Sequence, residues 1–323
     1  MSLRKSIKWI VLIVVAVLGI LIVVHRDWIE DWWTGMGYEA SSEMAEIRDK
    51  LYLTERGEFL FNASRPALND SDEFNAYCRS DLDMEMAVLG CYTDGNIYVY
   101  NITEDELSGI RELTTAHELL HAVWARMSEA KRRELVPSLT RAFESNQEML
   151  GEEIDTYDES QKQEELYVRA GTEVKDLPVD LEGHYAEIFR NQDLVVGYYD
   201  SYISVFRKMK AEMDGLKAEM DGIQEQIDTL SAEYENRLVQ LNGRITSFNA
   251  CADTSGCFGN EGEFYLQRND LLKAQEDLNR MYDEISRLVE EYNVRVKRYN
   301  EDVAYSNKLN NIVNSNAKPE KVE

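Results

Sequence analysis

The chain has 323 residues and is strongly acidic, because 61 Asp and Glu residues outnumber 35 Lys and Arg residues and give a formal net charge of −26 at pH 7. A surface of this charge repels nucleic acid and anionic lipid, which argues against a nucleic-acid-binding protein. No long acidic run stands alone, so a disordered acidic tail is not indicated either.

An apolar segment opens the chain. Residues 10–24 contain no charged or polar side chain, and with their apolar flank they reach about 18 residues, the short end of a spanning helix. Basic residues precede the run and tryptophans flank it. We therefore predict an N-terminal transmembrane anchor over residues 1–27, single-pass in the cell membrane, with the N-terminus cytoplasmic and the bulk of the chain extracytoplasmic. A cleaved signal peptide fits less well, because no small-x-small site follows.

Four cysteines fall into two local pairs, Cys78 with Cys91 and Cys251 with Cys257. Export from the cytoplasm would permit disulfide bonds, so we expect two local disulfides. The rival interpretation is a cysteine zinc site, but the Cys-x-x-Cys spacing typical of such sites is missing.

A small β-structure is predicted before the centre of the chain. Residues 40–61 have a helical pattern, and residues 62–75 are rich in turn-forming residues. Residues 86–100 contain two β-rich runs around Asp94-Gly95, which predicts a hairpin.

Helices are expected to follow the hairpin. Thr103 to Glu106 match a capping box, so a helix starts here and either runs on through residue 121 or breaks near Gly109. Ser128 is the expected N-cap of the next helix, which we predict to end before Pro137.

The segment 114–124 contains His-Glu-x-x-His among apolar residues at helical spacing. Four residues apart on a helix, His117 and His121 share one face and can meet at one metal ion. Glu118 is rotated about 100° from His117, beside that metal, where it can take a proton from a bound water. The alternative is an amphipathic helix with two exposed histidines that bind no metal.

These residues resemble the motif of the zincin metallopeptidases, and among these the gluzincins, whose third ligand is a glutamate on a later helix. The metzincin extension His-x-x-Gly-x-x-His is absent. The resemblance implies zinc-dependent peptide hydrolysis, one Zn²⁺ per chain, and a small sheet whose edge strand binds extended substrate. Residues 97–100 could be that edge, or the hairpin could only pack on the helix.

Zinc needs a third protein ligand and one open position for water. Within the helical pattern of residues 161–174, Glu165 is our first choice, since it heads an apolar helix, and Glu173 is the alternative. Glu164 and Glu153 are poorer choices. Most acidic residues in so acidic a chain are solvated surface, so the sequence does not decide between them.

His184 is the only other histidine between the motif and the C-terminus. It could be a metal ligand, or it could donate a hydrogen bond to the tetrahedral intermediate, with Tyr185 as the alternative donor. The competing interpretation is structural, because a lone histidine more often serves the fold.

Two long seven-residue repeats occupy the C-terminal part. Apolar residues recur every seven positions from Phe206 to Phe248 and again from Phe264 to Tyr299, with glycines and two cysteines between the runs. This pattern predicts two long helices that fold back on each other as an antiparallel coiled-coil hairpin, with the expected Cys251–Cys257 disulfide in the loop at its tip. A coiled coil has two apolar positions in each heptad. In the second helix, the second of these is expected at Tyr282, Val289, Val296 and Val303.

The predicted fold class is therefore mainly α with a small β-hairpin or sheet (an α+β zincin-like domain), followed by a long antiparallel coiled-coil hairpin. The zincin-like domain is expected over 36–195, the hairpin over 196–315 and a disordered tail over 316–323.

The predicted function is a membrane-anchored, extracytoplasmic zinc metallopeptidase. Its catalytic base would be Glu118, its zinc ligands His117, His121 and Glu165, and its partner a polypeptide substrate, an envelope or extracellular protein. A homo-oligomer through the coiled coil is an option. The alternative is a non-catalytic cell-surface coiled-coil interaction or scaffold protein with a degenerate zincin-like domain. The intact Glu118 argues against this, since a purely structural metal site needs no base.

Overall fold

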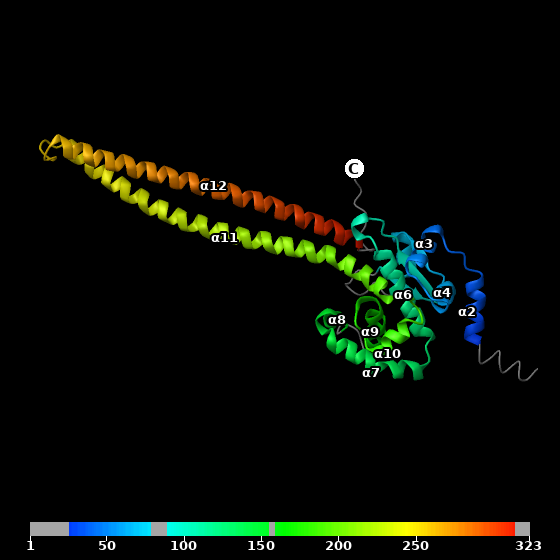
Figure 1. Cartoon of the computed structure of the whole chain (residues 1–323). Coiled ribbons are helices and arrows are strands. Elements are labelled where there is room, and N and C mark those ends of the chain that lie inside the picture. Colours follow the sequence, from blue (N-terminus) through cyan, green and yellow to red (C-terminus); the bar gives the residue numbers. More distant parts are fainter. Residues whose placement is uncertain (1–25, 79–88, 155–158, 314–323) are drawn as a thin grey trace, which may run out of the picture. The chain divides into compact units, whose positions relative to one another are not determined.

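The structure is a computed structural model that describes residues 26–78, 89–154 and 159–313. The protein is mainly helical with one small sheet, and its helices include two long ones near the C-terminus (Figure 1). The chain divides into two compact units, one made of residues 1–205 with 309–323, and one of residues 206–308. The predicted tail at 316–323 lies outside the described residues.

The first unit begins with helices on both sides of a short strand: α2 (Arg26–Met36), α3 (Ser42–Lys50), α4 (Glu55–Ala63), β1 (Ala67–Asn69) and α5 (Ser71–Tyr77). The strands β2 (Gly90–Thr93) and β3 (Asn96–Tyr100) follow, then a 3-10 turn, η1 (Asp105–Leu107). The remaining helices are α6 (Ile110–Arg126), α7 (Glu129–Ser145), α8 (Gln147–Ile154), α9 (Glu159–Glu173) and α10 (Val179–Tyr185).

The sheet has the strand order β1-β3-β2. The expected hairpin is present: β2 and β3 are antiparallel, and Asp94 and Gly95 take the left-handed φ values that a tight two-residue turn requires. Because β1 pairs in parallel with β3, β3 is the middle strand. Of the two alternatives for residues 97–100, the sheet edge is therefore wrong, and β1 and β2 are the outer strands of the described sheet. The hairpin packs on α6, as the other alternative held.

Helix α6 is the centre of the first unit, because it packs against β2 and β3 and also against α9. It begins after Gly109, whose φ of +93° is a conformation that glycine adopts without steric cost. The break near Gly109 is thus the alternative that the structure adopts. The buried side chains Leu119, Leu120 and Val123 place α6 in the main core.

Helix α7 differs from the prediction, because it continues through Pro137 to Ser145. Its N-terminus is as expected, since the Ser128 side chain accepts a hydrogen bond from the Lys131 amide.

The predicted single-pass membrane anchor and cell-membrane localisation require correction. None of the helices in residues 26–78, 89–154 and 159–313 is both long and apolar enough to cross a membrane. The apolar run at 10–24 lies outside these residues, and the helix that follows it, α2, has only 11 residues and carries charged side chains.

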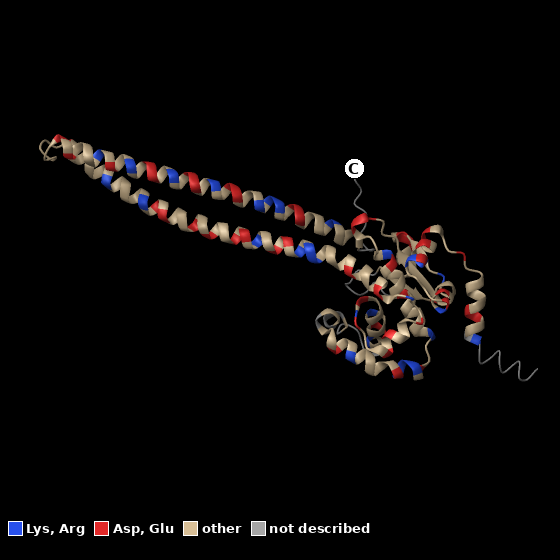
Figure 2. Cartoon of the chain, viewed as in Figure 1, with Lys and Arg blue, Asp and Glu red and all other residues tan. Residues whose placement is uncertain are grey.

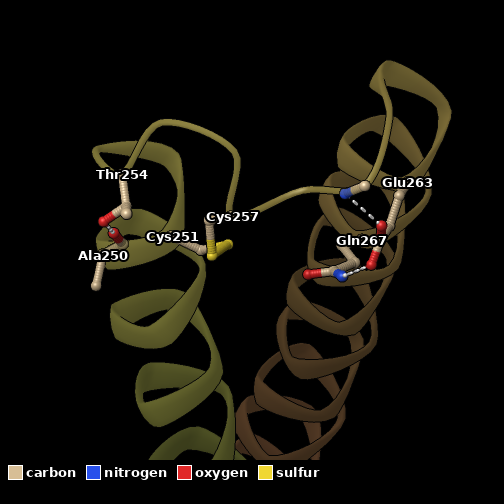
Figure 3. Close-up of a disulfide and its surroundings, with 7 residues drawn as sticks. Ala250, Cys251, Thr254, Cys257, Glu263 and Gln267 are labelled. Atoms are coloured by element: carbon tan, nitrogen blue, oxygen red, sulfur yellow. Dashed lines mark hydrogen bonds between the residues drawn. A yellow bond between two sulfur atoms is a disulfide. The ribbon is translucent and has the colours of Figure 1, made fainter.

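Both predicted disulfides are present. Cys78 and Cys91 join the end of α5 to β2 and are buried with Phe74 in a small core of their own. Cys251 and Cys257 close the loop after the first long helix (Figure 3). In the same loop, the Gly259 amide donates to Glu263 at 2.8 Å and so helps to start the second long helix.

The second unit consists of two long helices that pack together, taken from α11 (Gln192–Ala252) and α12 (Glu261–Val313). Contacts pair Glu219 with Arg295, Tyr234 with Tyr282, and Arg244 with Asp270. Since residue numbers fall on α12 as they rise on α11, the helices are antiparallel. Acidic and basic residues are interspersed along both helices (Figure 2).

The apolar face of α12 differs from the expected one. Leu288 is only 3 % exposed, whereas its neighbour Val289 is 41 % exposed and Tyr282 is 59 % exposed. In this part of α12 the inward residues Met281 and Leu288 therefore follow Leu278 and Ile285 by three positions. Farther along the helix, the expected Val296 and Val303 are partly buried. A spacing of three or four is equally compatible with 3.6 residues per turn, so the apolar sequence pattern did not distinguish them.

Candidate metal centre

The two motif histidines lie on one face of α6, with ring centroids 5.1 Å apart. Their side chains are partly accessible, 27 % for His117 and 15 % for His121. This arrangement follows from the four-residue spacing on an uninterrupted helix.

Helix α9 supplies the carboxylate that faces both rings. One oxygen of Glu165 lies 3.9 Å from His117 Nε2, and the other lies 3.4 Å from His121 Nε2. One ligand atom from each of the three residues lies within 4.8 Å of the others, so the group could hold a metal ion. Glu165, the first choice from sequence, is thus the glutamate brought to the histidines.

A second carboxylate orients one of the rings. Glu164 Oε1 lies 2.8 Å from His121 Nδ1, where it can accept the Nδ1 proton. With its Nδ1 proton held by Glu164, His121 has only Nε2, on the side of Glu165, to offer to a metal ion, and a bound metal would take the place of the Nε2 proton. Sequence reasoning had considered Glu164 only as a possible metal ligand.

The charges of the group favour a cation. Burial lowers the pKa of His117 well below its usual value, helped by the nearby charges of His121 and Arg169. Burial acts in the same direction on His121, but the hydrogen bond that its ring donates to Glu164 and the charges of three carboxylates raise its pKa to about 9. Burial raises the pKa of Glu165. Three carboxylates thus surround one imidazole, and a divalent ion would offset their negative charge.

Glu118 is held between α6 and the sheet. It is 6 % exposed, and its charge acts on His121. A Cβ added at Gly90 of β2 would lie 2.7 Å from Glu118 Oε1 and 2.6 Å from Thr114 Cγ2. The carboxylate therefore packs directly on the glycine backbone, which fixes its position beside the histidines.

The other candidates take different partners. Glu173 accepts two hydrogen bonds from the buried Arg169, at 2.8 and 2.9 Å. His184 Nε2 lies 3.0 Å from the Tyr167 hydroxyl, and Tyr185 donates to the Tyr167 carbonyl at 2.6 Å. These three residues are not in the metal-binding group found among the described residues. The side chain of Glu153 lies outside the described part of the chain.

Comparison with known proteins identifies no relative: no family model, no curated protein and no solved structure matches this chain.

Proposed function

We propose that the chain is a zinc-dependent metallopeptidase with a gluzincin-like site. The observation that carries this proposal is the convergence of His117, His121 and Glu165 from a His-Glu-x-x-His helix and a later helix. Two imidazoles and one glutamate, with one position left for water, form a known catalytic zinc donor set. Tetrahedral ligands about 2.0–2.1 Å from zinc lie roughly 3.4 Å apart. The imidazole–carboxylate distances of 3.4 and 3.9 Å are close to this value.

The accessibility of the three side chains supports a catalytic site over a closed structural one. The side chains of His117, His121 and Glu165 are 27 %, 15 % and 14 % exposed, so the group is not sealed from solvent. Structural zinc sites are normally closed by four protein ligands. The adjacent Glu118 adds a group that only a reactive site uses.

Each residue then has a distinct role. Zinc, when bound, lowers the pKa of a water molecule at the open position and polarises the substrate carbonyl. Glu118 takes the proton from the water and passes it to the leaving amine nitrogen, as general base and then acid. Glu164 keeps the lone pair of His121 Nε2 available by accepting the Nδ1 proton. The substrate is a polypeptide.

For the whole chain, we propose a zincin-like domain over residues 36–195 and an antiparallel coiled-coil hairpin over 196–315. The heptad repeats and the antiparallel side-chain pairs of α11 and α12 support the hairpin. A spacer or an oligomerisation stalk is the role that such a hairpin fits.

The proposed activity is tested by Glu118→Gln, which removes the base and keeps the shape of the side chain. We expect cleavage of an unfolded protein such as casein to fall by about 10²–10⁴-fold while bound zinc is unchanged. Glu106→Gln, at an exposed position before α6, is the matched control and should cleave at the wild-type rate. Equal cleavage by wild type and Glu118→Gln would show that the enzyme proposal is wrong.

A further inference from the structure

A small cavity of about 70 Å³ lies in the first unit, away from the metal centre. From α6 it is lined by Val123, Arg126 and, just past the helix end, Met127. Val123 follows His121 by two residues and so points about 200° away from it around the helix. A water molecule needs about 10–15 Å³ by this kind of measure, so there is room for a small polyatomic ligand.

The charged lining of this cavity is mainly basic, although the chain is strongly acidic. Three cations, Arg56, Arg126 and Lys131, face it with one carboxylate, Glu187. Arg56 pairs with Glu187, while the partners of the other two, Asp31 and Glu134, do not line the cavity. The lining residues themselves thus carry three positive charges and one negative charge, and each of the three cations has a carboxylate partner.

The N-terminus of α7 adds to this positive potential. Met127 and Lys131, which both line the cavity, stand on either side of the N-cap residue Ser128. The N-terminal end of a 17-residue helix carries a partial positive charge and favours anions.

One residue of the cavity lining has a buried polar atom that lacks a hydrogen-bond partner within the described part of the chain. His184 also lines the cavity and is 5 % exposed, and its Nδ1 atom is buried without a hydrogen-bond partner among the described residues. Its Nε2 atom faces the Tyr167 hydroxyl at 3.0 Å. Burial raises the pKa of Tyr167 and lowers that of His184, so the hydroxyl keeps its proton and the imidazole is neutral. With the hydroxyl donating to Nε2, the ring proton sits on Nδ1, a buried donor that needs an acceptor.

We propose that this cavity binds a small oxyanion of the phosphate type. The Nδ1–H group of His184 supplies a buried neutral donor, and Arg56 and Lys131 supply charge-assisted hydrogen bonds. Such an ion would satisfy the orphaned imidazole donor and offset the excess of cations. The site is independent of the proposed peptidase activity.

Isothermal titration of the full chain with inorganic phosphate tests the proposal. We expect saturable binding that sodium chloride at equal ionic strength does not reproduce. The double variant Arg56→Gln/Lys131→Gln should bind phosphate at least about 10-fold more weakly. Arg133→Gln is the matched control, because Arg133 lies on the same helix and its side chain is 71 % exposed. It should bind phosphate as the wild type does.

A second readout follows the histidine itself. The chain has only four histidines, so long-range ¹H–¹⁵N spectra can resolve each imidazole. Phosphate should shift the Nδ1 resonance of His184, and His184→Phe should lose binding. The proposal is overturned if phosphate shows no saturable binding, or if the double variant binds it as tightly as Arg133→Gln does. Zinc content and peptide cleavage are separate measurements, so either proposal can fail alone.

Discussion

Among single residues, Glu164 stands out because its carboxylate contacts His121, one of the three proposed metal ligands. It lies 2.8 Å from His121 Nδ1, so it fixes both the tautomer and the ring orientation. We predict that Glu164→Gln lowers zinc affinity by about 10–100-fold, the usual effect of removing such a partner. Competition with a chelating dye would measure this change. Gln163→Ala, at the exposed neighbouring position, is the control, and equal affinities in the two variants would exclude the role of Glu164.

The same residues show how far sequence could define the site. His117 and His121 could be identified because their spacing alone puts them on one helix face. Glu164 and Glu165 are neighbours about 100° apart on α9, and only the rotation of α9 against α6 decides which one faces both rings. That rotation depends on packing with residues distant in sequence, such as Tyr167 against Trp124. The hydrogen-bond partners of His184 and Tyr185 could not be predicted either, because they also depend on contacts between residues distant in sequence.

Among the secondary-structure elements, strand β2 packs directly against the Glu118 side chain. A methyl group at Gly90 would meet Thr114 and Glu118 at 2.6–2.7 Å, so one of them must move. We predict that Gly90→Ala lowers peptide cleavage while zinc stays bound, and costs about 1–3 kcal/mol of stability through overpacking.

Gly197→Ala is the control for this change, since nothing lies within 4 Å of a Cβ added there. Cleavage assays, zinc analysis and chemical denaturation would be compared for the two variants. Normal cleavage by Gly90→Ala would mean that β2 does not hold the carboxylate proposed to be catalytic.

The sheet shows which strand pairings can be predicted from the sequence and which cannot. The β2–β3 hairpin could be predicted, because Asp94-Gly95 and the flanking β-rich runs are local signals. Strand β1 has only three residues in a turn-rich stretch, and its parallel pairing with β3 joins residues about 30 apart. No local pattern reports such a pairing, so the sequence left open whether residues 97–100 form an edge strand.

At the scale of the whole molecule, the second unit depends on the face that α12 turns toward α11. We predict that Leu288→Ala destabilises this unit by about 2–5 kcal/mol, because Leu288 is 3 % exposed and its removal leaves a cavity. Val289→Ala should change stability by no more than about 0.5 kcal/mol, because Val289 is 41 % exposed.

Denaturant unfolding followed by circular dichroism would compare the two variants, and zinc analysis should find the same metal content in both. A larger loss of stability from Val289→Ala than from Leu288→Ala would reverse the assigned face of α12. The heptad repeat itself could be predicted from the sequence. Whether the second inward residue of each heptad follows the first by three or by four positions could only be seen in the packed structure.

The most direct test of the account is the zinc content of the protein after exposure to zinc and removal of excess metal. The wild type should hold one zinc per chain. Glu165→Ala should lose it, because that carboxylate faces both histidines. Glu173→Ala should keep it and instead lose about 3–5 kcal/mol of stability, because the change removes the carboxylate that the buried Arg169 binds. No zinc in the wild type, or zinc lost from Glu173→Ala and kept in Glu165→Ala, would contradict the proposed metal centre.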